Sequence, residues 1–97
     1  MILGKVIGTV WSTRKDENLV GAKFLIVRQL NLDYTPKDST LIAVDSVGAG
    51  VGEVVIVAQG SSARQTTITK NKPVDAVIMA IVDKLDIAVT GIKKEGN

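Results

Sequence analysis

The chain has 97 residues, of which 45% are hydrophobic, and it contains no cysteine and no histidine. Its 12 basic and 10 acidic residues leave a formal net charge of +2. These numbers predict one small domain without disulfides, thiolate metal sites or histidine chemistry, and a charge too mild to require an anionic partner such as nucleic acid.

The first half of the chain predicts a β-hairpin. Residues 2–13 are rich in β-branched side chains and predict a long strand, in which Gly4 and Gly8 mark bends or bulges. A charged turn follows at 14–18, and residues 22–30 predict a second strand. The segment 31–39 contains Asp, Pro and Ser at turn-compatible positions and predicts a surface loop.

The second half predicts three more strands. Residues 40–47 and 53–58 predict strands three and four, and 61–65 a short helical turn capped by Ser61 or Ser62. After the polar span 66–73, residues 77–89 predict a last strand, although 76–82 alone also fits a buried helix. We therefore expect an all-β fold: a small five-stranded antiparallel barrel, closed or partly open, with one short helix, in a domain of residues 1–92 followed by a polar tail at 93–97.

The sequence also bears on location and assembly. No apolar secretory segment follows Met1, and the longest apolar runs, at 54–58 and 76–82, are far shorter than the roughly 20 residues of a membrane helix. We expect a soluble, cytoplasmic protein with no membrane partner. A domain of this size buries only about 60–70% of its unfolded surface, so part of the apolar surface should close against other copies of the chain.

The segment 45–64, DSVGAGVGEVVIVAQGSSAR, joins a three-glycine loop to a strand and a polar turn. Its glycines lead into a strand and lack the helix or the Lys-Ser/Thr pair of nucleotide-binding loops, so phosphate binding is disfavoured. The loop suits close approach to another chain, although a glycine-rich hairpin without that role remains the alternative. We expect Asp45 to accept hydrogen bonds from the backbone of the loop or of a neighbouring subunit, and Glu53 to pair with a basic residue, with Arg64 as a candidate.

Four segments carry a family resemblance: GKVIGTVWSTRK, LVGAKFLIV, AVDSVGAGVGEVVIVAQGSSAR and PVDAVIMAIVD. In this order and spacing they resemble the EutN/CcmL family of bacterial microcompartment shell proteins, over residues 2–89. The resemblance implies an OB-like barrel that assembles as a cyclic homopentamer and closes the vertices of a shell built otherwise from hexameric shell proteins. It implies a structural protein with no enzymatic activity and no cofactor.

The resemblance also suggests where subunits meet, because five loops can converge on an axis only if their side chains are small. The expected axis and interface residues are Ser46, Val47, Gly48, Ala49, Gly50, Val51, Gly52 and Glu53. Further interface residues are expected at Asp45, Ser61, Ser62, Ala63 and Arg64. Arg14, Lys15 and Asp16 are either solvated or contact adjoining shell proteins.

Two other features leave alternatives. Trp11, the only tryptophan, is expected to pack against the barrel or a neighbouring subunit, because no second aromatic residue lies close in sequence to form a ligand cage. The competing function is an OB-like module for nucleic acid or a small ligand. Such modules pair a basic groove with stacking aromatics. Here Trp11, Phe24 and Tyr34 are scattered, and no basic stripe accompanies them.

Overall fold

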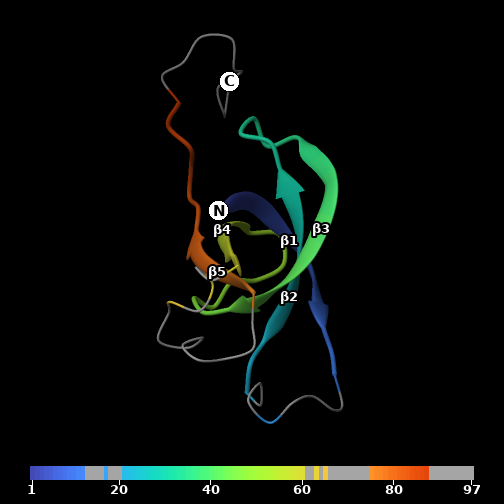
Figure 1. Cartoon of the computed structure of the whole chain (residues 1–97). Helices are drawn as coiled ribbons and strands as arrows, with labels where there is room; N and C mark the ends of the chain where they lie inside the picture. The colour runs from blue at the N-terminus through green and yellow to red at the C-terminus, as the bar shows by residue number, and fades with distance from the viewer. Residues whose placement is uncertain (13–16, 18–20, 61–62, 64, 66–74, 88–97) are drawn as a thin grey trace.

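The computed structural model describes residues 1–12, 17, 21–60, 63, 65 and 75–87. Five strands close into one barrel in the order β1-β2-β3-β5-β4 (Figure 1). The strands are β1 (Ile2–Val10), β2 (Phe24–Leu30), β3 (Pro36–Asp45), β4 (Val54–Gln59) and β5 (Ala76–Ile81). The predicted five-stranded barrel is therefore confirmed, and it is closed.

The predicted hairpin of the first two strands is also confirmed, because β1 and β2 pair antiparallel. Their register shifts between Val6 and Gly8, which places the predicted irregularity at Gly8. Gly4 has a different role: it pairs regularly with Gln29 and Val55, and a Cβ atom there would overlap the side chain of Val27. Close packing inside the barrel therefore explains that glycine.

One pair of strands differs from the expected antiparallel arrangement. β3 and β5 run parallel, through the register pairs Val44 with Val77 and Asp45 with Ile78. The β4 strand lies between β1 and β5 and pairs antiparallel with both. The barrel closes through this short parallel pair, which joins strands far apart in the sequence and has no local sequence signal.

Several predicted boundaries are wrong. β1 ends at Val10 rather than at residue 13, and β5 ends at Ile81, so residues 82–87 are not in a strand. The loop predicted at 31–39 spans only 31–35, because β3 already begins at Pro36. The helical alternative for 76–82 is excluded by β5. Most of the predicted helical turn at 61–65 and the tail 93–97 lie outside the described residues, among which there is no α-helix.

The barrel interior holds the main core. Its buried side chains come from all five strands and from the loop after β3: Val6, Leu25, Val27, Ala43, Ala49, Val55, Val57, Ala76 and Ile78. A second cluster contains Val44, Ala58 and Val77, which alternate with the interior residues on β3, β4 and β5, together with Ala63. Ala63 thereby fastens the segment after β4 to the outside of the barrel.

Candidate functional site

The glycine loop, residues 45–53, is organised by one carboxylate. Asp45 ends β3, and its Oδ1 atom accepts hydrogen bonds from the backbone N–H groups of Val47 (3.0 Å), Gly48 (3.0 Å) and Ala49 (3.1 Å). Its side chain is only 4% exposed. The prediction that Asp45 accepts backbone hydrogen bonds is confirmed, and the donors belong to its own loop.

Lys23, the residue before β2, also contacts this loop. Its Nζ atom donates to the carbonyl oxygen of Ala49 at 3.3 Å and lies 3.9 Å from Oδ2 of Asp45. The Asp45 N–H in turn donates to the Lys23 carbonyl oxygen at 2.9 Å. Lys23 was not among the predicted site residues, because a lysine before a strand carries no sequence signal for a contact 26 residues away.

The far end of the loop is held by Glu53 and by β1. The Glu53 Oε1 atom accepts the Gly50 N–H at 2.6 Å. The Gly52 N–H donates to the Val6 carbonyl at 2.8 Å, and the Val6 N–H to the Glu53 carbonyl at 2.9 Å. Gly48 and Gly52 adopt φ values of 78° and 94°, in the left-handed region that favours glycine. Among the described residues Glu53 forms no ion pair, and its predicted partner Arg64 lies outside them.

Most backbone N–H groups of the glycine loop form hydrogen bonds within the subunit. Seven donate to partners in the chain: those of Asp45, Val47, Gly48, Ala49, Gly50, Gly52 and Glu53. Phosphate-binding loops need such groups free and converging on the ligand. The loop is therefore not a phosphate cradle, in agreement with the sequence. It is a braced turn on which Val47 and Val51 are exposed.

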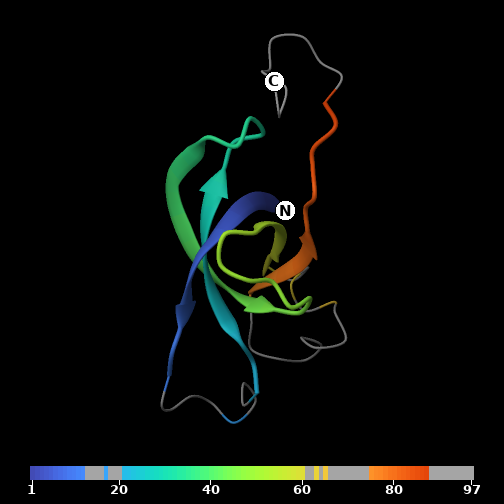
Figure 2. The ribbon, with the colours of Figure 1, turned by 180° about the vertical axis from the view of Figure 1, so that it is seen from behind.

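The loop is also fixed to the last strand. Figure 2 shows the connection between β3 and β4, in yellow-green, curling between β1 and β5. The Ser46 Oγ atom donates to the carbonyl oxygen of Ile78 at 2.5 Å. Ala49 points into the core and is fully buried. Of the predicted axis residues 46–53, the structure therefore assigns Ser46, Ala49 and Glu53 to internal contacts and leaves the two valines at the surface.

The remaining predicted interface residues are mostly not described. Ser61, Ser62 and Arg64 lie outside the described residues, as do Arg14, Lys15 and Asp16. Ala63 is fully buried in its own subunit. In the part of the chain that the structure describes, no group of three or more acidic residues could hold a metal ion.

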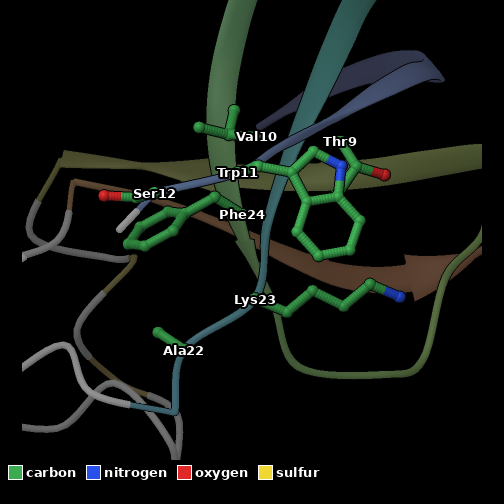
Figure 3. Close-up of a pocket in the computed structure, with 7 residues that line it drawn as sticks. All are labelled: Thr9, Val10, Trp11, Ser12, Ala22, Lys23 and Phe24. Carbon is green, nitrogen blue, oxygen red and sulfur yellow. The ribbon is translucent and has the colours of Figure 1, made fainter. Parts of the chain in front are cut away.

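Near the end of β1 lies a pocket of about 500 Å³, which we call the Trp11 pocket (Figure 3). It is lined by residues 9–12 and 22–24. Trp11 itself is 90% exposed, so the predicted packing of this residue against the barrel is not found. In Figure 3 the Trp11 indole and the Lys23 side chain extend in the same direction, and the Phe24 ring extends in the opposite one.

Comparison with known proteins identifies the family. Residues 1–83 match the sequence profile of a protein family whose description is "Ethanolamine utilisation protein EutN/carboxysome". The chain belongs to the EutN/CcmL family. The shell vertex protein GrpN of Rhodospirillum rubrum, from a bacterial microcompartment, is 52% identical over 89% of this chain and 97% of its own length. The carboxysome shell vertex protein CcmL of Synechocystis is 43% identical over 91% and 88%.

A solved structure agrees with this assignment. The pentameric microcompartment shell protein GrpN from Rhodospirillum rubrum superimposes with a TM-score of 0.82 at 50% identity, covering 90% of this chain and 99% of that one. The EutN/CcmL relatives are structural shell proteins, which agrees with the expectation that this chain is not an enzyme. Among the described residues there is no helix long and apolar enough to cross a membrane.

Proposed function

We propose that five copies of this chain form a closed ring that occupies a vertex of a bacterial microcompartment shell. The match to shell vertex proteins over nearly the whole of both chains, together with the fold of the pentameric GrpN structure, carries this proposal. A sheet of hexagonal tiles cannot close by itself, and a five-fold ring introduces the curvature that closure needs. The proposed partners are therefore further copies of the chain and hexameric shell proteins.

The surface of the single subunit supports assembly. Ile7 on β1 and Ile42 on β3 are 48% and 55% exposed, and Ile26 on the strand between them pairs in register with Ile42. Exposed aliphatic side chains on neighbouring strands form the kind of apolar surface that a second subunit covers. This agrees with the expectation, from the size and composition of the chain, that part of its apolar surface is closed by other copies.

Native mass spectrometry of the purified chain tests the ring. A dominant species of about 52 kDa, five times the 10.3 kDa chain, is expected. A monomer at every concentration would overturn the proposal. Shells assembled from hexameric proteins with and without this chain, compared by electron microscopy, test the vertex role: closed polyhedra should require the chain.

We further propose that the glycine loop faces the five-fold axis and the neighbouring subunits. Val51 is 65% exposed on this loop, so a substitution there tests whether the loop lies at the axis. In a Val51→Asp variant five carboxylates would meet near the axis, so the ring should dissociate at low salt and recover at high salt. Leu32→Asp is the matched control, because Leu32 is also exposed but lies beyond the opposite end of β2 from Lys23. Equal behaviour of both variants would place the loop away from the axis.

The polar turn after β4 is proposed to hold adjacent subunits together through Ser61, Ser62 and Arg64, with Ala63 anchoring the turn to its own barrel. Arg64→Ala should lower the stability of the ring, and an equally stable ring would count against this role. Contact with hexameric shell proteins is proposed for Arg14, Lys15 and Asp16. The double change of Arg14 and Lys15 to Glu should leave the ring intact but reduce its incorporation into shells.

A control for that shell experiment is the same double charge change made in the polar tail, at Lys93 and Lys94. It alters the net charge of the chain by the same amount at a different place. Equal loss of incorporation in both variants would point to net charge instead of a specific contact.

A further inference from the structure

We infer that the Trp11 pocket is a contact between neighbouring subunits, occupied by a second copy of this chain. The inference rests on the proposed ring and names a surface through which neighbouring subunits of that ring contact each other. Trp11 is the only tryptophan and is 90% exposed in the single subunit. A tryptophan side chain buries roughly 150–250 Å² when it is covered, and interface hot spots are enriched in this residue.

The walls of the pocket favour an apolar protein surface over a small charged ligand. Val10, Ala22 and Phe24 contribute apolar lining, and the pocket has a volume of about 500 Å³. The cationic group at its edge is the Lys23 ammonium, which already donates to the Ala49 carbonyl and lies beside the Asp45 carboxylate. Its charge is thus compensated within the subunit, which leaves little attraction for an anion.

The pocket is continuous with the glycine loop. Lys23 belongs to both, because its side chain lines the pocket and its Nζ atom lies 3.3 Å from the Ala49 carbonyl oxygen in the loop. The Trp11 indole extends in the same direction as Lys23 (Figure 3). If the loop contacts the neighbouring subunit, as proposed above, the same neighbour reaches the indole and covers it.

The symmetry of a ring decides what kind of surface enters the pocket. In a cyclic pentamer each interface is head-to-tail, so two different faces of the chain meet. The Trp11 pocket therefore receives another face of the next subunit, not a second Trp11 pocket. Once the next subunit covers it, Trp11 is a buried aromatic anchor, and truncation of such an anchor to alanine costs a large part of the binding energy.

The single tryptophan makes the inference directly measurable. Excited at wavelengths beyond the absorption band of Tyr34, the full chain fluoresces from Trp11 alone, and acrylamide quenching measures the accessibility of its indole. In samples that native mass spectrometry shows to be pentameric, the quenching constant should be several-fold lower than that of free N-acetyl-tryptophanamide. It should rise towards the free value when dilution dissociates the ring. A pentamer whose tryptophan is quenched as freely as the reference compound overturns the inference and leaves the proposed ring standing.

Variants give an independent readout. Trp11→Ala should raise the chain concentration at which half of the rings dissociate by about tenfold or more, whereas Trp11→Phe should have a smaller effect. Leu32→Ala, an exposed apolar residue at the other end of β2, is the matched control and should not change it. Far-UV circular dichroism checks that each variant is folded.

The other outcomes are also decisive. Unchanged ring stability in a folded Trp11→Ala variant contradicts the inference. A tryptophan that is freely quenched in the pentamer and becomes shielded only when hexameric shell proteins are added assigns the pocket to those proteins instead. A tryptophan shielded even in dissociated chains shows that its own subunit covers it. A chain that is monomeric throughout overturns the ring and the inference together.

Discussion

Replacing Asp45 should disrupt the glycine loop by an amount that can be worked out from its contacts. In Asp45→Ala three backbone N–H groups lose their acceptor. Ala49 is fully buried, and a buried donor left without a partner costs about 1–3 kcal/mol. Val47 and Gly48 are exposed, so water replaces the lost acceptor at about 0.5 kcal/mol each. The ion pair with half-exposed Lys23 adds little.

The expected loss for Asp45→Ala is therefore about 2–4 kcal/mol in the free energy of unfolding. Asp45→Asn keeps an acceptor oxygen for the loop N–H groups, loses the negative charge and places an amide NH2 group where Oδ2 lay, beside Lys23. It should lose about 1 kcal/mol, because hydrogen bonds to charged acceptors are the stronger ones. Urea unfolding followed by circular dichroism measures both values from the transition midpoint and slope. All samples need the same chain concentration, because assembly raises the apparent stability.

Asp38→Ala is the control for this experiment. Asp38 is a fully exposed carboxylate 3.6 Å from Arg28, and removing it should not measurably change the stability. Ordinary surface substitutions change the free energy of unfolding by about 0.5 kcal/mol or less. If the value for Asp45→Ala differs from that of the wild type by no more than this, the carboxylate does not organise the loop and the reasoning is refuted.

Three further predictions concern the barrel, the loop after β2 and the alternative function. Gly4→Ala should destabilise by about 1–3 kcal/mol, measured by thermal unfolding, because its Cβ atom would overlap the Val27 side chain and lie 3.0 Å from the Arg28 carbonyl oxygen. Gly8→Ala should change stability less, because its Cβ atom would meet only the Ile26 side chain, at 3.4 Å or more. The Thr35 hydroxyl and, to a smaller extent, the Thr35 N–H donate to Asp33 and lower its pKa. The ionised carboxylate therefore stabilises the folded state at neutral pH, and this contribution is lost as pH falls below about 4. Thr35→Val should raise that pKa in an NMR titration of the carboxyl carbon, and an unchanged pKa would argue against the hydroxyl bond. A labelled single-stranded oligonucleotide should show no salt-sensitive micromolar binding in a fluorescence titration, whereas such binding would favour the nucleic-acid module.

Strand number and approximate position were predictable because they depend on local composition. Runs of β-branched residues separated by turn residues indicate strands wherever they fold. The start of β3 was missed for the same reason: Pro36, Asp38 and Ser39 are typical of turns. They join the strand because Pro36 pairs with Leu30, and because the Arg28 side chain donates to the Lys37 carbonyl and lies beside Asp38. Those contacts depend on the partner strand.

In the glycine loop, too, some contacts were predictable from nearby residues and others depended on the fold. The position of Asp45 at the start of the glycine loop indicated a carboxylate that accepts backbone hydrogen bonds, and the contacts with residues 47–49 confirm it. The partner of Glu53 was not predicted correctly. Its carboxylate accepts the nearby Gly50 N–H, and this contact depends on how the loop folds. The contact of Lys23 with the loop required the strand register, which places the start of β2 beside the end of β3.

By itself, the sequence determined a small all-β domain, a glycine loop between its third and fourth strands that begins at an acceptor carboxylate, and a resemblance to shell vertex proteins. These features depend on residues close to one another along the chain, or on a pattern of segments that comparison detects. The tertiary structure decided that β3 and β5 close the barrel in parallel, that Lys23 locks the loop, and that Trp11 is left exposed beside a pocket. Each of these depends on contacts between distant segments, which exist only once the chain has folded.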